Sequence, residues 1–271
     1  MHAIVAAMRA AILSDLHGNS IALRAVLSDI DGQGGVDEYW VLGDLAASGP
    51  DPAGVVAMVA ALPQARVIRG NTERYLLGED PPILTQADAS PGLSVRKMMQ
   101  IASSFAWARG VVTGAGWLPW IAALPLEFRL TLPGGLRVRA VHSSLTSDED
   151  DGFHPKLTDE SLAAMLAGCD ADVIVAGHTH LPLKRRVGDV HIINVGSVGL
   201  PMTFDRRACY AILEANERAW HIEHRRVAYD WEAASGAIRA SGYPDKEFLE
   251  RAMRGEMRHR NALHPELIED G

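Results

Sequence analysis

The stretch "VIVAGHTHLP", residues 173–182, places two histidines directly after a run of apolar, mostly β-branched residues. Such a run predicts a buried strand. His178 and His180 stand two positions apart, and residues i and i+2 of an extended chain point to the same side. Both imidazoles can therefore face one common object at the end of this strand.

Composition limits which ligands and partners the protein can have. The chain has 271 residues, 48% of them hydrophobic and 22% charged, which is enough to bury one large core and predicts one globular domain with additional elements. The net charge of −8 argues against nucleic acid as a partner, because binding to phosphate backbones requires a surplus of Lys and Arg. The oligomeric state cannot be read from the sequence.

The two cysteines, Cys169 and Cys209, form no CxxC pair. They therefore indicate neither a disulfide framework nor a thiolate zinc site, and a reducing cytoplasm is the expected location. No stretch approaches the roughly 20 apolar residues that cross a bilayer, so no association with a membrane is expected.

The first third of the chain alternates between strand and helix patterns. Apolar runs end in "SD", "GD" and "GN", and the segments between them carry apolar residues at helical spacing. Asp51 precedes Pro52 as the expected N-cap of the second helix. This βαβαβ order predicts a layered α/β sheet. The expected elements are strands at 10–15, 38–44 and 65–71 and helices at 19–30 and 51–62.

The remainder predicts a helical insert at about 85–124, a helix at 158–169 and three hairpins. The hairpin turns are expected at residues 133–135, at Gly188-Asp189 and at Ala215-Asn216. Met8 is as plausible a start as Met1, so the expected domain covers residues 8–230. A charged helical tail, residues 231–271, is expected to pack on it or extend from it.

Polar side chains stand at the ends of these strands. Ligands gather at the carboxyl ends of strands in open α/β sheets. A lone "GD" or "GN" usually marks only a turn, and a lone histidine is usually structural, but their order here favours one common metal site. Imidazole, carboxylate and amide ligands without thiolate suit Mn, Fe, Ni or Zn better than Ca or Mg. The candidate ligands are Asp15, His17, Asp44, Asn71, His142, His178 and His180.

Six motifs resemble, in order, those of the calcineurin-like metallophosphoesterases. They are "SDLHGN", "VLGDLAASGPDP", "VIRGN", "AVHSS", "AGHTHLP" and "NVGSVGLP". The final hairpin is similar to the ending of a bacterial branch of small YfcE-like phosphodiesterases and dinucleoside-polyphosphatases. The resemblance covers residues 9–230 and implies a four-layer α/β/β/α sandwich with two divalent metal ions at one edge of the sheets.

The resemblance also divides the ligands between the two ions. Asp15, His17, Asp44 and His180 would hold one ion, and Asp44, Asn71, His142 and His178 the other, with Asp44 bridging. Two ions about 3.5 to 4 Å apart can share a hydroxide that attacks phosphorus in line. Manganese is the favoured metal, and Asp44, Asn71 and His142 are the expected catalytic residues.

The expected reaction is hydrolysis of phosphodiester or phosphoanhydride bonds in a small or nucleotide-like substrate. Phosphomonoesterase activity of the protein-phosphatase kind and a catalytically weak metal-binding scaffold are the alternatives. The physiological substrate cannot be read from the sequence.

Two residues are expected to contact the substrate. Asn19 resembles the family residue that steadies the edge of the site, but it could equally be only the N-cap of the following helix. Arg74, like Arg69, flanks Asn71 and could grip a phosphate through bidentate contacts, or form a salt bridge instead.

One position departs from the family pattern. Many members read "GNH" followed by Asp or Glu, and that histidine protonates the leaving group; here the sequence is "GNTE", with Thr72 in its place. A threonine hydroxyl is too weakly acidic to act as a general acid near neutral pH. The reaction is therefore expected to depend on the quality of the leaving group.

Overall fold

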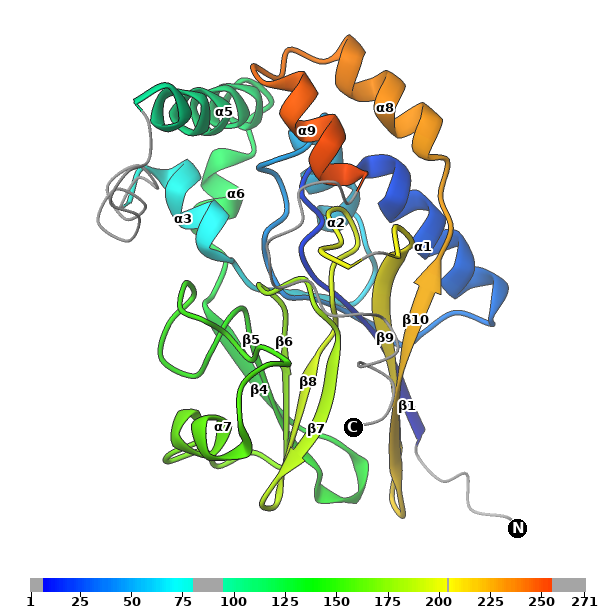
Figure 1. The fold of residues 1–271 in the computed structure, drawn as a ribbon. Coiled ribbons are helices and arrows are strands. Elements are labelled where there is room, and N and C mark those ends of the chain that lie inside the picture. Colours follow the sequence, from blue (N-terminus) through cyan, green and yellow to red (C-terminus); the bar gives the residue numbers. More distant parts are fainter. Residues whose placement is uncertain (1–6, 80–94, 204, 255–271) are drawn as a thin grey trace.

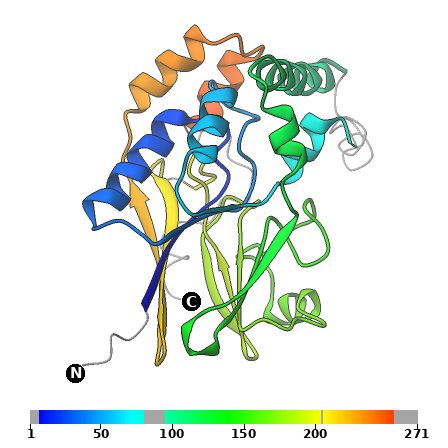
Figure 2. The same ribbon diagram turned by 180° about the vertical axis from the view of Figure 1, so that it is seen from behind.

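The computed structural model describes residues 7–79, 95–203 and 205–254. Two five-stranded sheets lie face to face with helices outside them (Figures 1 and 2). The first sheet has the order β10 (Trp220–Val227), β9 (Ala208–Asn216), β1 (Ala7–Leu13), β2 (Glu38–Val41) and β3 (Ala65–Val67). The second has the order β4 (Glu127–Thr131), β5 (Arg137–Val141), β6 (Val173–Ala176), β8 (Val190–Asn194) and β7 (Leu183–Val187).

Both sheets mix parallel and antiparallel pairs. Strands β1, β2 and β3 are parallel, as the βαβαβ pattern predicts, and β9 and β10 add an antiparallel hairpin to the β1 edge. In the second sheet β5, β6 and β8 are parallel, while β4 and β7 are antiparallel to their neighbours. The parallel strands of each sheet bring their carboxyl ends to one edge, where the candidate ligands follow.

Alternation along β1 explains the layers. Ile12 faces Trp40 and Val175 in the core between the sheets, whereas Leu13 faces the helices on the outer side. Helices α1 (Ser20–Gly32) and α2 (Pro52–Ala60) cover that outer side, and α7 (Asp159–Met165) covers the other sheet through Leu162. The predicted four-layer α/β/β/α sandwich is confirmed.

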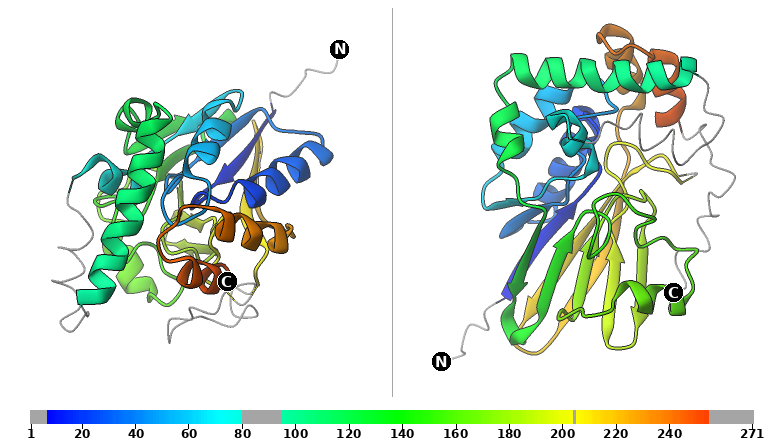
Figure 3. Two further views of the ribbon diagram at one scale, coloured as in Figure 1. Left: turned by 90° about the horizontal axis from the view of Figure 1, so that it is seen from above. Right: turned by 90° about the vertical axis from the view of Figure 1, so that its left-hand side faces the viewer.

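Further helices gather at one end of the sandwich. The longest, α5 (Val95–Gly114), lies across that end (Figure 3), and α3 (Asn71–Leu77) and α6 (Leu118–Ala122) pack near it. Within the described residues the predicted helical insert contains α5 and α6, and its first residues, 85–94, lie outside that part of the chain. Helix α3 was not predicted, because it begins directly at the candidate ligand Asn71.

The predicted C-terminal tail contains α8 (Trp231–Ala240) and α9 (Lys246–Met253). Ile238 of α8 and Leu249 of α9 form a small core with Leu200, against which Ile21 of α1 packs. Residues 255–271 of the predicted tail lie outside the described residues.

The turn predicted at Ala215-Asn216 is wrong by two positions. Strand β9 continues through Asn216, and Ala215 pairs with Trp220 of β10. The Asn216 side-chain oxygen accepts hydrogen bonds from the backbone N–H groups of Arg218 and Ala219. Asparagine therefore ends the strand and stabilises the turn from its first residue.

Candidate metal centre

Four predicted ligands form one compact cluster. One ligand atom from each of Asp15, His17, Asp44 and His180 lies within 4.8 Å of the others, and all four residues are buried. The Nε2 atoms of His17 and His180 are only 3.1 Å apart, and Asp15 Oδ1 lies 3.2 Å from His180 Nε2. We call these four residues the first ligand group.

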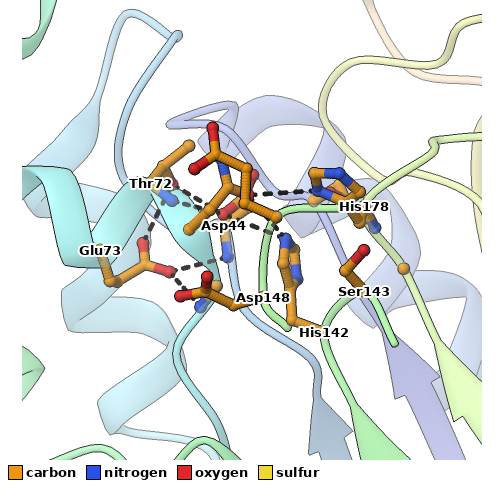
Figure 4. A network of polar contacts seen from close by, with 12 residues as sticks. Asp44, Thr72, Glu73, His142, Ser143, Asp148 and His178 are labelled. Carbon is orange, nitrogen blue, oxygen red and sulfur yellow. Dashed lines mark hydrogen bonds and ion pairs between the residues drawn. The ribbon is translucent and has the colours of Figure 1, made fainter. Parts of the chain in front are cut away.

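The other predicted ligands lie beside them and form the second ligand group with Asp44. Asn71 Oδ1 is 3.1 Å from His142 Nε2 and 3.2 Å from His178 Nδ1. Asp44 Oδ1 is 3.4 Å from His142 Nε2, whereas Asp44 Oδ2 is 3.7 Å from His17 Nε2. One carboxylate oxygen therefore faces each group, and Figure 4 shows His142 and His178 on one side of Asp44.

Each of the four histidines is oriented by a backbone carbonyl. The carbonyl oxygens of Ala47, Leu42, Asp150 and Leu200 contact one ring nitrogen of His17, His142, His178 and His180, respectively. A carbonyl oxygen only accepts hydrogen bonds, so that nitrogen carries a proton, and in a neutral ring the other nitrogen keeps a lone pair that can bind a metal. In all four rings the nitrogen without a carbonyl partner faces the centre of the site, which is the arrangement of metal-binding histidines.

The backbone at the ligands is also unusual. Seven non-glycine residues have positive φ in the described ranges, and five of them are predicted ligands. L-residues with side chains adopt this left-handed conformation rarely, and it persists where function requires it. The five are Asp15 (55°), His17 (43°), Asp44 (54°), His178 (68°) and His180 (58°).

The glycines of "GD" and "GN" bring Asp44 and Asn71 together. Gly43 has φ of 93°, and a Cβ atom there would lie 2.4 Å from the backbone nitrogen of Gly70. A Cβ on Gly70 would lie 2.3 Å from Asp44 Oδ1. Only glycine at both positions lets the two turns pack backbone to backbone, which places both ligands at one edge.

The electrostatics of the site fit a cation. Burial and the nearby Asp15 charge raise the pKa of Asp44 to about 7. Burial, followed by the neighbouring His180, lowers the pKa of His17 to about 3. The Oδ1 atom of Asp15 is buried and has no hydrogen-bond partner among the described residues. Burial alone would lower the pKa of His180, but the nearby Asp15 carboxylate raises it above its ordinary value. Two crowded carboxylates and inward-facing imidazole nitrogens suit a divalent cation, which would offset the repulsion between the carboxylates.

Glu73 supports this site and was not predicted. Its buried carboxylate accepts hydrogen bonds from the backbone N–H groups of Asp44 (2.8 Å), Leu45 (2.8 Å) and Gly70 (2.9 Å). It thereby ties the two glycine turns to each other. Burial and the Asp44 charge raise the pKa of Glu73 to about 7. The sequence signal was its place in "GNTE", where the family motif also carries an acidic residue.

Thr72 is engaged by Asp44. Its backbone N–H and its hydroxyl both donate to Asp44 Oδ1, at 3.0 and 2.9 Å (Figure 4). The hydroxyl proton is therefore directed at a ligand rather than at a leaving group. This geometry agrees with the expectation that Thr72 supplies no general acid.

Asp150 is a second support that the sequence did not reveal. Its carboxylate accepts hydrogen bonds from Ser143 Oγ (2.7 Å), from the Ser144 hydroxyl and from the Gly152 N–H (2.9 Å). Its carbonyl oxygen is the one that orients His178, at 2.9 Å. Because Ser143 directly follows His142, Asp150 links two ligands of the second group.

The two predicted substrate contacts have partners within the protein. Asn19 Oδ1 caps α1 by accepting from the Ala22 N–H, and its amide donates to the Gly199 carbonyl at 3.1 Å. Arg74 pairs with Asp148 at 3.0 Å and Glu149 at 2.6 Å. The N-cap and salt-bridge alternatives therefore describe the observed contacts of these two residues, and their contact with a substrate stays an untested prediction.

The family model described as the calcineurin-like phosphoesterase superfamily domain matches residues 8–218. This chain belongs to that superfamily. Membership and the buried Asp/His cluster together indicate a metal-binding hydrolase that acts on phosphoesters. Among the described residues, none of the helices has both the length and the apolar character to cross a membrane.

Individual relatives agree with this assignment. The crystal structure of a metallophosphoesterase from Sphaerobacter thermophilus is 27% identical with a TM-score of 0.72, covering 92% of this chain and 99% of that one. An uncharacterized protein of Methanocaldococcus jannaschii is 26% identical over 251 residues, which are 87% of this chain and 93% of that protein.

Likenesses to enzymes with named activities are weaker. A symmetrical bis(5'-nucleosyl)-tetraphosphatase of Proteus mirabilis is 35% identical over 68 residues, 25% of each chain. The E. coli phosphoesterase YfcE is 21% identical with a TM-score of 0.44, which adds no support for placing the chain in that branch.

Proposed function

We propose that this protein hydrolyses phosphodiester or phosphoanhydride bonds of small, nucleotide-like substrates with two divalent transition-metal ions. The observation that carries the proposal is the position of Asp44, which turns one oxygen to each of two adjacent ligand groups. A single ion would need only one of these groups. Manganese is the proposed metal, with Fe, Ni and Zn compatible with the same ligands.

The chain's residues have distinct tasks in this reaction. When bound, the ions would activate water and neutralise charge on the phosphoryl oxygens. Asp15, His17 and His180 would hold one ion, Asn71, His142 and His178 the other, and Asp44 both. The backbone carbonyls on the far ring nitrogens orient all four histidines so that the other ring nitrogen points inward, which positions these side chains for the ions.

Phosphoanhydrides suit a site without a positioned acid. A phosphate leaving group departs as a weak base and needs little protonation, whereas an alkoxide needs much. The threonine hydroxyl that replaces the family's histidine donates to Asp44. The partial likeness to symmetrical bis(5'-nucleosyl)-tetraphosphatases supports including dinucleoside polyphosphates among the substrates.

The proposal is tested with chelated protein reloaded with Mn²⁺. We expect hydrolysis of bis(p-nitrophenyl) phosphate and of a dinucleoside tetraphosphate, both abolished by chelation and restored by the metal. Slower hydrolysis of p-nitrophenyl phosphate would separate this activity from that of a phosphomonoesterase. Two bound ions without turnover of any of the three substrates would instead identify a metal-binding scaffold.

A matched histidine variant controls for general effects of substitution. His17→Gln should remove both activity and one bound ion. His221→Gln replaces an exposed histidine of β10, outside both ligand groups, and should change neither.

A further inference from the structure

A cavity opens beside the second ligand group. It has a volume of about 620 Å³, and its lining includes His142, Arg69, Arg74 and the loop residues Asp148 and Glu149. The same cavity therefore touches a predicted metal ligand and two arginines. A substrate whose phosphorus lies at the metal centre would extend its neighbouring groups into this space.

The charged side chains that line the cavity differ in how well their charges are neutralised by ion pairs. The Arg74 guanidinium is held by Asp148 and Glu149, so its positive charge is balanced by residues on the same wall. Glu127, another lining residue, is paired with Arg129 and Arg139. These pairs leave little net charge to offer to a ligand.

Arg69 differs from Arg74 in this respect. Its Nε is buried without a hydrogen-bond partner among the described residues, and its charged partner is Glu79, 3.5 Å from Nη1. The Glu79 side chain is 53% exposed, against 18% for Arg69, so solvent screens this pair and it stabilises little. Among the described residues this mostly buried guanidinium has one weak ion-pair partner, so its charge is poorly compensated, and an anion in the cavity would compensate it.

We infer that Arg69 binds a second phosphate group of the substrate, next to the phosphate that is hydrolysed. The inference rests on the proposed function and narrows it to substrates with adjacent phosphates, such as nucleoside polyphosphates. A planar guanidinium binds phosphate oxygens through two parallel hydrogen bonds. Arg74 is assigned a different task, that of holding the loop at 148–150 in place.

The position of Arg69 in the chain supports this assignment. Its backbone N–H donates to the Pro125 carbonyl at 2.9 Å, which anchors the segment just before Gly70 and Asn71. The guanidinium therefore starts from a fixed point two residues from a predicted ligand. The phosphate at the metal centre and the adjacent phosphate in the cavity would both be bound by residues of one short segment.

A matched ligand pair tests the inference. AMP and ADP share a nucleoside and differ by one phosphate, and both are measured as inhibitors of bis(p-nitrophenyl) phosphate hydrolysis by the Mn²⁺-loaded protein. In the wild type, ADP should inhibit more strongly than AMP. Arg69→Gln should weaken ADP inhibition relative to AMP inhibition by at least about tenfold, because a charge-assisted phosphate contact is lost. Arg69→Lys should lie between the two.

Two further variants separate specific from general effects. Arg74→Gln should weaken AMP and ADP alike, since it disturbs the loop rather than a phosphate contact. Arg186→Gln, an exposed position of β7, should change neither. Selectivity for ADP that survives in Arg69→Gln, or that disappears in Arg74→Gln instead, would overturn the inference.

The design also separates this inference from the proposed function. If the wild type hydrolyses no substrate, the proposed function fails, and AMP and ADP affinities are then measured by calorimetry on the Mn²⁺-loaded protein. A tenfold selective loss of ADP affinity in Arg69→Gln would still support the binding role of Arg69. Equal losses for the two nucleotides would refute it. Metal content and circular dichroism of each variant show whether it has folded.

Discussion

The two ligand groups share Asp44 but are built differently. The first contains a second carboxylate, Asp15, and is fully buried. The second adds only the neutral amide of Asn71, and His178 is partly exposed. We expect the first group to bind its ion more tightly, because two negative charges attract a cation more than one. One member of the second group, His142, lines the cavity beside Arg69 and Arg74.

Their supports differ in the same way. The carbonyls that orient His17 and His180 belong to Ala47 and Leu200, which are themselves buried. His178 depends on Asp150, in a loop whose neighbour Asp151 is exposed. The second group can therefore be weakened without touching the first, and the comparison can be tested one residue at a time.

The largest effect is expected for the residue common to both groups. Asp44→Asn should lower kcat/KM by on the order of 10³-fold or more, because both ions lose a charged ligand. Elemental analysis should find fewer than one tightly bound ion per chain instead of two. His180→Ala, which removes a ligand of one group only, should cost less. Near-normal turnover by Asp44→Asn would contradict the bridging role.

The next effect concerns Thr72, on the side of Asp44 that faces the second group. The natural protein should hydrolyse aryl phosphodiesters with a steep dependence on leaving-group pKa, since a missing general acid typically costs about 10² to 10⁴-fold. Thr72→His should flatten that dependence. The slope of log kcat against leaving-group pKa is the measurement. A shallow slope in the natural protein, unchanged in the variant, would show that another group supplies the proton.

A smaller effect should separate the two groups cleanly. Asp150→Ala removes the carboxylate that holds the loop carrying the carbonyl for His178. Loss of such an outer contact typically lowers metal affinity by about 10 to 100-fold. Calorimetric titration with Mn²⁺ should show weakening of one ion only. Asp151→Ala, the exposed neighbour, is the control, and equal weakening of both ions would remove the distinction between the groups.

The smallest effect concerns a support farther from the site. His224 Nε2–H donates to the Asn194 carbonyl at 2.7 Å, and the Asn194 side chain donates to Thr179 Oγ1, between His178 and His180. Burial lowers the pKa of His224 below its ordinary value of 6.5. The unfolded chain therefore takes up this proton more readily, and stability should fall as pH drops below that value.

His224→Gln keeps a donor for Asn194 but cannot be protonated. It should reduce the pH dependence of the unfolding free energy by up to about 1.4 kcal/mol per pH unit. Urea unfolding of the metal-free protein at about pH 5.5 and about pH 7.5 measures this difference. Identical slopes for variant and wild type would exclude a contribution from His224.

Local patterns in the sequence predicted much of the fold and which candidate ligands lie together in the structure. The candidate ligands directly follow apolar strands. The ends of these strands can be located from the point at which a run of apolar residues stops. The placement of Asp44 beside Asn71 also had a local signal, the glycines of "GD" and "GN". What could not be predicted were contacts between distant segments. Glu73 reaches Asp44 across 29 positions and Ser197 reaches the Asp15 carbonyl across 182.

The missed elements have related causes. Helix α3 is seven residues long and starts at a ligand, so it offered too few turns for helical spacing to show. Asp150 lies in the polar run "SDEDD", in which the sequence does not mark one carboxylate as different from its neighbours. Arg69 and Arg74 likewise look alike in the sequence, and only their ion pairs distinguish them.

Because the backbone is left-handed at five ligands, the thermal stability of the protein should depend on bound metal. Each such residue lowers the free energy of unfolding by on the order of 1 kcal/mol. Together the five lower it by about 5 kcal/mol, which is comparable to the whole net stability of many domains. Ions that bind only the folded state would raise the free energy of unfolding and offset this cost. Reloading with Mn²⁺ should therefore raise the melting temperature sharply. In a homologue that is no longer under selection for activity, substitution of these residues by glycine or asparagine would increase stability. Substitutions that remove activity would therefore be favoured first at the metal centre.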